Sequence, residues 1–222
     1  MNLQNADIEV PGTFYVFVGS HPVTRHNLQF TRSLKSTGLV GALQSEEGRL
    51  AYLEGVTNYW PFEPGQGLRS GFISMFASSI TSGYRLEYNC ELFRRCDQQA
   101  RTYPSRLSAL FAFGDEVSLH RASDLYGWDL RTVKRFRLVD GELNRVVRVN
   151  MEVISMMRHA EAISSMSPED NQAIWSHYWS GGGEISIELP ASDQNGRHAQ
   201  TSGVIWEYLI EGRLELLDSE HA

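Results

Sequence analysis

The chain has 222 residues, 41% apolar and 21% charged, so it can bury a substantial core and has the composition of an ordinary globular protein. Its 20 basic and 27 acidic residues give a net charge of −7, which disfavours non-specific binding to nucleic acid, although a local basic stretch could still bind an anion. These numbers exclude fibrous and disordered classes and predict a single domain over residues 1–222.

Residues 1–12 lack the basic and apolar regions of a signal peptide, and no apolar run approaches the ~20 residues that a membrane helix needs. The spacing of the two cysteines, Cys90 and Cys96, matches no metal or redox motif. We therefore expect a cytoplasmic protein with reduced thiols and no membrane partner.

The first predicted element is a strand over residues 13–18, closed by Gly19-Ser20 and followed by His21. Residues 24–71 are polar and Gly-rich and show no sustained period. Because so long a connection is rarely bare loop, this region predicts short helices or strands, or a lid over a site. Residues 13–83 thus form an N-terminal strand plus a variable or lid region.

A helix is predicted between residues 73 and 96, because apolar residues recur at a four-residue step. They are Phe76, Ile80, Tyr84, Tyr88, Leu92 and Cys96, and Gly83 is a possible interruption. On the same helix Glu91 and Arg95 lie four residues apart and can pair at the surface. Pro104 disfavours helical geometry at the residue before it, so a strand should follow over residues 108–113.

The C-terminal half predicts further strands and two helices. Two β-branched runs around Asp140-Gly141 predict a hairpin, Asn150 is placed to cap the next helix, and Ser167-Pro168 begins another. Strands are predicted over residues 184–189 and within 204–217. Strands separated from clustered helices indicate the α+β class with largely antiparallel sheets.

Several enzyme classes lack their motifs. There is no P-loop, and "GLRSGF" has neither the glycine spacing nor the preceding strand of a dinucleotide fingerprint. The seven histidines include no HExxH, so a zinc or iron site would need long-range assembly, and no G-x-S-x-G elbow marks a serine hydrolase.

Three polar positions in or next to predicted strands remain as site candidates: His21, the group Ser105, Arg106 and Ser108, and Glu207. Each also has a purely structural interpretation. His21 can be a loop histidine, the serines and arginine can belong to a turn that covers a helix end, and Glu207 can lie on the polar side of an edge strand.

Together these residues lie within a set of short motifs: Glu91 with Arg94, "YPSRLSALFAF", a Gly-containing hairpin, "YWSGG" and "WEYLIEGRLELL". The set resembles an uncharacterised bacterial and phage family that looks like a branch of the ADP-ribosyltransferase superfamily. The resemblance covers residues 84–217, and it implies two packed, mostly antiparallel β-sheets with flanking helices and NAD bound in a cleft between them.

By this resemblance Glu207 is the catalytic carboxylate, and His21, Ser105, Arg106 and Ser108 bind NAD as the substrate. An arginine fork suits the pyrophosphate, and an ionised carboxylate stabilises the positive charge that develops on the ribose. The chain departs from the usual Glu/Gln-x-Glu pattern because Ile205 stands two residues before Glu207. A nucleic-acid, Asp/Glu or small-molecule acceptor, or NAD hydrolysis, therefore fits better than modification of arginine.

The resemblance thus implies an NAD-dependent ADP-ribosyltransferase that modifies a macromolecule in bacterial or phage conflict, as a toxin or a defence factor. The alternative is a non-catalytic protein of the same fold that binds a host or antitoxin protein, with Arg106 and Glu207 as a structural ion pair. A third hypothesis is a phage structural or host-interaction protein that uses the aromatic-rich residues 52–67, including Tyr59 and Trp60.

Overall fold

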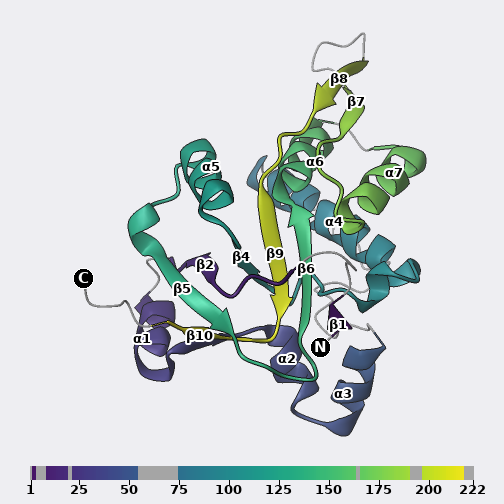
Figure 1. The fold of residues 1–222 in the computed structure, drawn as a ribbon. Helices are drawn as coiled ribbons and strands as arrows, with labels where there is room; N and C mark the ends of the chain where they lie inside the picture. The colour runs from purple at the N-terminus through teal and green to yellow at the C-terminus, as the bar shows by residue number, and fades with distance from the viewer. Residues whose placement is uncertain are drawn as a thin grey trace.

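The computed structural model describes residues 2–3, 9–19, 22–54, 75–163, 166–190 and 197–217. These residues form an α+β fold with two four-stranded sheets and a separate two-stranded hairpin (Figure 1). The α+β class and the mostly antiparallel sheets predicted from the sequence are confirmed. None of the described helices is long and apolar enough to cross a membrane.

The first sheet, sheet A, has the strand order β1-β6-β9-β4. Its strands are β1 (Asn2–Leu3), β4 (Leu110–Ala112), β6 (Arg145–Asn150) and β9 (Trp206–Glu211). The longest pairing is antiparallel, between β6 and β9, and it runs from Arg145 opposite Glu211 to Asn150 opposite Trp206. The short β1 pairs in parallel with β6, and β4 pairs antiparallel with β9.

The second sheet, sheet B, has the order β2-β5-β10-β3 and is antiparallel throughout. Its strands are β2 (Phe14–Phe17), β3 (Ser33–Lys35), β5 (Val133–Leu138) and β10 (Arg213–Leu216). Tyr15 of β2 and Phe113, directly after β4, exchange two backbone hydrogen bonds of 2.8 Å. The two sheets are therefore joined at this bridge.

A hydrophobic core fills the space between the two sheets. Sheet B contributes residues such as Phe14 and Phe136, and sheet A contributes Tyr208 and Ile210. Because side chains alternate along a strand, Glu207, Leu209 and Glu211 of β9 point to the opposite face of sheet A.

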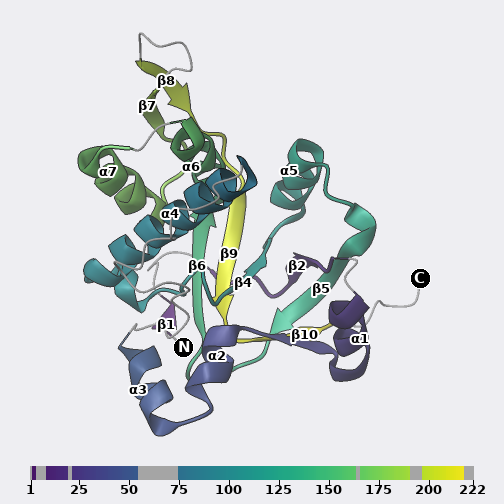
Figure 2. The same ribbon diagram turned by 180° about the vertical axis from the view of Figure 1, so that it is seen from behind.

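That opposite face is covered by three helices, α4 (Met75–Cys96), α6 (Met151–Ile163) and α7 (Pro168–Trp179) (Figure 2). The remaining helices are α1 (Pro22–Thr31), α2 (Thr37–Ala42), α3 (Glu46–Leu53) and α5 (Glu116–Tyr126), with short 3-10 turns η1 (Ala100–Thr102) and η2 (Leu130–Thr132). The hairpin of β7 (Ser186–Pro190) and β8 (Arg197–Thr201) projects from the end of the molecule near α6 (Figure 1).

Several local predictions are confirmed. The strand expected over residues 13–18 is β2, the helix expected between 73 and 96 is the uninterrupted α4, and the strand expected over 108–113 is β4. Ser167 caps α7, since its hydroxyl accepts a hydrogen bond of 3.0 Å from the amide of Asp170. Short helices and a strand occupy the described part of residues 24–71, as one of the alternatives for that region predicted.

The hairpin predicted around Asp140-Gly141 is wrong, because its two strands belong to different sheets. β5 pairs with β2 and β10, whereas β6 pairs with β1 and β9. β6 is buried on both faces and so fits the interior of sheet A, whereas three residues of β5, among them Arg135 and Arg137, are exposed. The segment between them carries the chain from one sheet to the other.

The buried face of α4 also differs from the predicted one. Leu92 and Cys96 are exposed, whereas Leu86, Cys90, Glu91 and Arg94 are buried. Apolar periodicity misplaced this face because two of its buried residues are charged. Their burial is possible because Arg94 pairs with Glu91 at 2.6 Å, where the sequence had predicted a surface pair of Glu91 with Arg95.

Candidate functional site

The segment after Pro104 directs two successive side chains, Ser105 and Arg106, toward two different pairs of carboxylates. The Ser105 hydroxyl donates to a Glu91 carboxylate oxygen at 2.8 Å, and its amide donates to Glu211 at 3.2 Å. Arg106 instead reaches the carboxylates of Glu87 and Glu207. Glu87 and Glu91 lie one turn apart on α4, and Glu207 and Glu211 lie on one face of β9. The helix and the strand therefore each supply one carboxylate to both pairs.

The guanidinium of Arg106 is almost fully engaged by protein groups. Its Nε lies 3.0 Å from Glu87 Oε2, and its Nη1 lies 3.1 Å from Glu207 Oε1. The same Nη1 donates to the hydroxyl of Tyr178 at 2.6 Å. Only 7% of the Arg106 side chain is exposed, so this cation is held in a fixed position between two carboxylates.

Burial and charge act on the two carboxylates in different ways. Burial raises the pKa of Glu207 above its ordinary value, and the neighbouring Arg106 opposes this rise only in part. Burial also acts to raise the pKa of Glu87, but Arg106 and Arg158 together outweigh it, so that pKa is lowered. Glu207 is therefore the carboxyl of the pair that retains a proton more readily.

Glu207, Arg106 and Glu87 line a pocket of about 860 Å³. This volume lies within the range of ligand-binding pockets for small molecules and cofactors. Its lining residues come from β2 of sheet B, from β4 and β9 of sheet A, from α4 and α6, and from the segment between α5 and β5. The pocket therefore lies beside the bridge where the two sheets meet.

Aromatic rings form a second wall of this pocket. They are Phe17, Phe111, Phe113, Tyr126 and Trp128. The rings of Tyr126 and Trp128 are stacked with centroids 5.3 Å apart, and Phe17 meets Trp128 edge-on at 5.2 Å. Trp128 is 40% exposed, so one aromatic face of this wall is open to solvent.

Two further polar groups border the pocket. Arg158 of α6 lies 3.5 Å from Glu87 and is 61% exposed. The Tyr126 hydroxyl donates to Glu152 and lies 2.8 Å from the hydroxyl of Ser155, and burial with the hydrogen bond to Glu152 raises the pKa of Tyr126 to about 12. Arg158 is thus the more accessible of the two arginines at the pocket.

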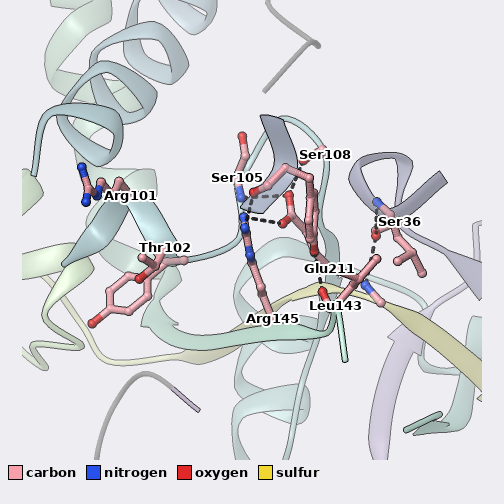
Figure 3. Close-up of polar contacts among 12 residues, drawn as sticks. Ser36, Arg101, Thr102, Ser105, Ser108, Leu143, Arg145 and Glu211 are labelled. Carbon is pink, nitrogen blue, oxygen red and sulfur yellow. Dashed lines mark hydrogen bonds and ion pairs between the residues drawn. The ribbon is translucent and has the colours of Figure 1, made fainter. Parts of the chain in front are cut away.

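A second buried polar cluster surrounds Glu211 (Figure 3). The Ser108 hydroxyl donates to Glu211 Oε1 at 2.5 Å, and Arg145 Nη1 lies 3.6 Å from Oε2. A Cβ at Gly38 would lie only 2.8 Å from the Glu211 carboxylate, so the absence of a side chain there lets α2 approach. Arg145 also packs 4.0 Å from the centre of the Tyr52 ring, which ties α3 to this cluster.

The structure thus brings together two of the predicted site residues, Arg106 and Glu207. Ser105 and Ser108 face the Glu91 and Glu211 clusters and do not line the pocket. His21 lies outside the described residues, as do Tyr59 and Trp60 of the aromatic-rich segment.

Glu87, Arg158 and the aromatic wall were not predicted from the sequence, and Tyr178 was noted only as part of the motif "YWSGG". One usable signal was the position of Glu87, one helical turn before Glu91, on a helix whose buried face already carried charges.

Among the described residues, no group of three or more His, Cys, Asp or Glu side chains could hold a metal ion. No family model matches the chain, and no curated protein shows significant similarity to it.

Proposed function

We propose that this chain is an NAD-consuming ADP-ribosyltransferase and that the pocket containing Glu207 binds NAD. The observation that carries the proposal is a buried carboxylate, held by a fixed arginine, in the wall of a pocket lined by strands of both sheets. The resemblance of the sequence to ADP-ribosyltransferases implies the same substrate, but that superfamily holds NAD in a cleft between two sheets, whereas Glu207 and Phe17 line this pocket from the faces that point away from the core between the sheets.

Glu207 has the chemistry that this reaction requires. When the bond between ribose and nicotinamide breaks, the bond electrons leave with nicotinamide and positive charge develops on the ribose. An ionised Glu207 next to the sugar stabilises that charge, and a nucleophile of the acceptor then forms the new bond to the anomeric carbon. The proton that this nucleophile loses can pass to Glu207, because burial raises the pKa of that carboxyl.

Arg106 takes a different role in this proposal from the one implied by the resemblance. Its donors are occupied by Glu87, Glu207 and Tyr178, so a pyrophosphate would have to displace protein groups to bind it. We therefore assign Arg106 to the positioning of Glu207 and the more exposed Arg158 to the pyrophosphate. The aromatic wall suits the flat bases of the dinucleotide. Binding of NAD by His21 remains a prediction.

The proposal is tested by measuring the release of nicotinamide from NAD by the purified protein, with and without cell lysate as a source of acceptors. Glu207→Gln should lower the rate by about a hundredfold or more, since it removes the charge that stabilises the transition state. Glu211→Gln is the matched control, because it changes a buried carboxylate on the same strand that does not line the pocket. Circular dichroism must show that both variants fold. Equal release by wild type and Glu207→Gln, or no release with any acceptor pool, contradicts the proposal.

A non-catalytic protein of the same fold is the second candidate. The full engagement of Arg106 favours it, because a structural ion pair between Arg106 and Glu207 needs no ligand. Thermal unfolding separates the two candidates, since a protein that binds NAD is stabilised in proportion to the logarithm of the NAD concentration. A melting temperature that does not change with NAD, together with the absence of nicotinamide release, would favour the second candidate.

A further inference from the structure

The outer face of sheet B carries a basic patch, although the whole chain is acidic. Four cations point outward from three adjacent strands: Lys35, Arg135, Arg137 and Arg213. Glu215 is the one acidic residue among them in these strands. We call these four cations the basic face.

The register of the strands places these side chains next to one another. Arg213 lies directly opposite Lys35, and Glu215 lies directly opposite Arg137. Arg135 is two residues from Arg137, so both point to the same side of β5, roughly 7 Å apart along the strand. The neighbouring residues Phe136 and Leu214 point the other way, into the core between the sheets.

The basic face is open to solvent and only partly neutralised. Lys35, Arg135 and Arg137 are exposed, and the helices α4, α6 and α7 gather against sheet A rather than against β5 and β10 (Figure 2). Glu215 pairs with Arg137 at 2.5 Å and with Arg213 at 3.5 Å. Within the part of the chain that the structure describes, Arg135 and Lys35 form no ion pair. Four cations stand against Glu215 within these strands and against Glu116 of α5, which accepts from Tyr15 opposite Arg135, so the face keeps an excess of positive charge, opposite in sign to the net charge of the chain.

We propose that the basic face binds the phosphate backbone of a nucleic acid. Cations at regular intervals suit a polymer that carries one charge on each unit, and the planar guanidinium of arginine binds phosphate with two hydrogen bonds. An interface with a protein would instead be depleted of charge at its centre and enriched in aromatic anchors. The rings on this face are Tyr15, whose hydroxyl already donates to Glu116, and Phe17, which packs into the aromatic wall of the pocket.

The location of the basic face gives this binding a consequence for the pocket. β5 begins at Val133, and the residue before it, Thr132, lines the pocket. A nucleic acid bound along β5 would therefore reach the mouth of the pocket. Nucleic acid is thus the class of acceptor for ADP-ribose that this site favours. This last step rests on the proposed function, whereas the binding of nucleic acid does not.

Binding is measured without NAD, by the fluorescence anisotropy of labelled oligonucleotides of about 16 nucleotides, both single-stranded and as a duplex. If four phosphates are contacted, the affinity for the single strand should fall about 50-fold between roughly 50 and 200 mM salt. Arg135→Ala with Arg137→Ala should reduce this fall to about 7-fold, because two of the four contacts are lost. Arg49→Ala with Arg101→Ala is the control, since it removes the same charge from exposed arginines on α3 and η1.

The salt series and one competition decide the proposal. It is supported if the wild type binds either probe and the Arg135 and Arg137 variant binds more weakly and with a shallower salt dependence than the control. It is overturned if the wild type binds neither probe at low salt, or if the two variants lose affinity equally. Displacement of the oligonucleotide by poly-glutamate at equal charge concentration would also overturn it, in favour of an acidic protein. Nicotinamide release plays no part in these readouts, so the two proposals can fail separately.

Discussion

Replacement of Arg106 by methionine tests whether this cation holds the pocket carboxylate in place. The change removes the charge but keeps a side chain of similar length in a site where the arginine is 7% exposed. Glu207, itself 7% exposed, then loses its ion pair at 3.1 Å, and Tyr178 loses a hydrogen bond of 2.6 Å. Glu87 keeps Arg158 at 3.5 Å and is less affected.

The expected loss of stability follows from the charge that remains buried. Removing one member of a buried ion pair destabilises a protein by about 3–5 kcal/mol, because the remaining charge is left uncompensated. Since Glu87 keeps a cation, we expect Arg106→Met to lower the free energy of unfolding by about 3 kcal/mol. Urea denaturation followed by circular dichroism measures this quantity.

A second variant separates the charge effect from a loss of packing. Adding Glu207→Gln to Arg106→Met removes the uncompensated carboxylate and should recover about 1–2 kcal/mol of the loss. The reasoning is refuted if Arg106→Met costs less than about 1 kcal/mol, or if the double variant is no more stable than Arg106→Met alone.

Three further predictions concern pH, the second cluster and a turn. Because burial raises the pKa of Glu207, the ionisation of this carboxyl costs stability in the folded protein. The wild type should therefore lose stability relative to Glu207→Gln as the pH rises from about 4.5 through the raised pKa. Urea denaturation at several pH values measures this difference, and the opposite trend would disprove the prediction. Ser108→Ala should lower the free energy of unfolding by about 2 kcal/mol, because it removes a hydrogen bond to the buried Glu211 carboxylate. The same change should leave NAD binding unchanged, and a calorimetric titration that shows lost binding would contradict the separation of the Glu207 and Glu211 clusters. Gly127→Ala should lower the free energy of unfolding by about 1 kcal/mol, since Gly127 ends α5 with a φ of 68°, and an unchanged thermal melting curve would argue against strain there.

Local signals in the sequence were sufficient where one residue decides the local structure. Ser167-Pro168 marks the start of α7 because a capping hydroxyl and a preset φ act within one turn. α5 carried similar signals and was overlooked: Asp115 caps its first turn, and Gly127 adopts the left-handed conformation at its end. Its amphipathic pattern is short, and it lies between two segments with strong strand patterns.

Strand partners could not be predicted in this way, because pairing depends on contacts between distant residues. The run after Asp140-Gly141 looks like the return strand of a hairpin, but β6 is buried on both faces and takes a central position in sheet A. The site also depends on contacts between residues that are distant in the sequence. Arg106 stood out because it lies beside a predicted strand and Glu207 because it lies inside one, whereas Glu87 and Tyr178 lie in helices, and Tyr178 was noted only as part of the motif "YWSGG".

The last two strands that the structure describes are interior strands, β9 between β6 and β4, and β10 between β5 and β3. During synthesis, β4 and β6 therefore emerge from the ribosome before β9, which must lie between them, and β3 and β5 emerge before β10. A nascent chain that ends before Trp206 has unpaired edges on β3, β4, β5 and β6, which are surfaces prone to aggregation or to capture by chaperones. Both sheets should thus be completed only after β9 and β10 have been synthesised, and deletion of these two strands should be far more harmful than loss of an equal length from the hairpin of β7 and β8.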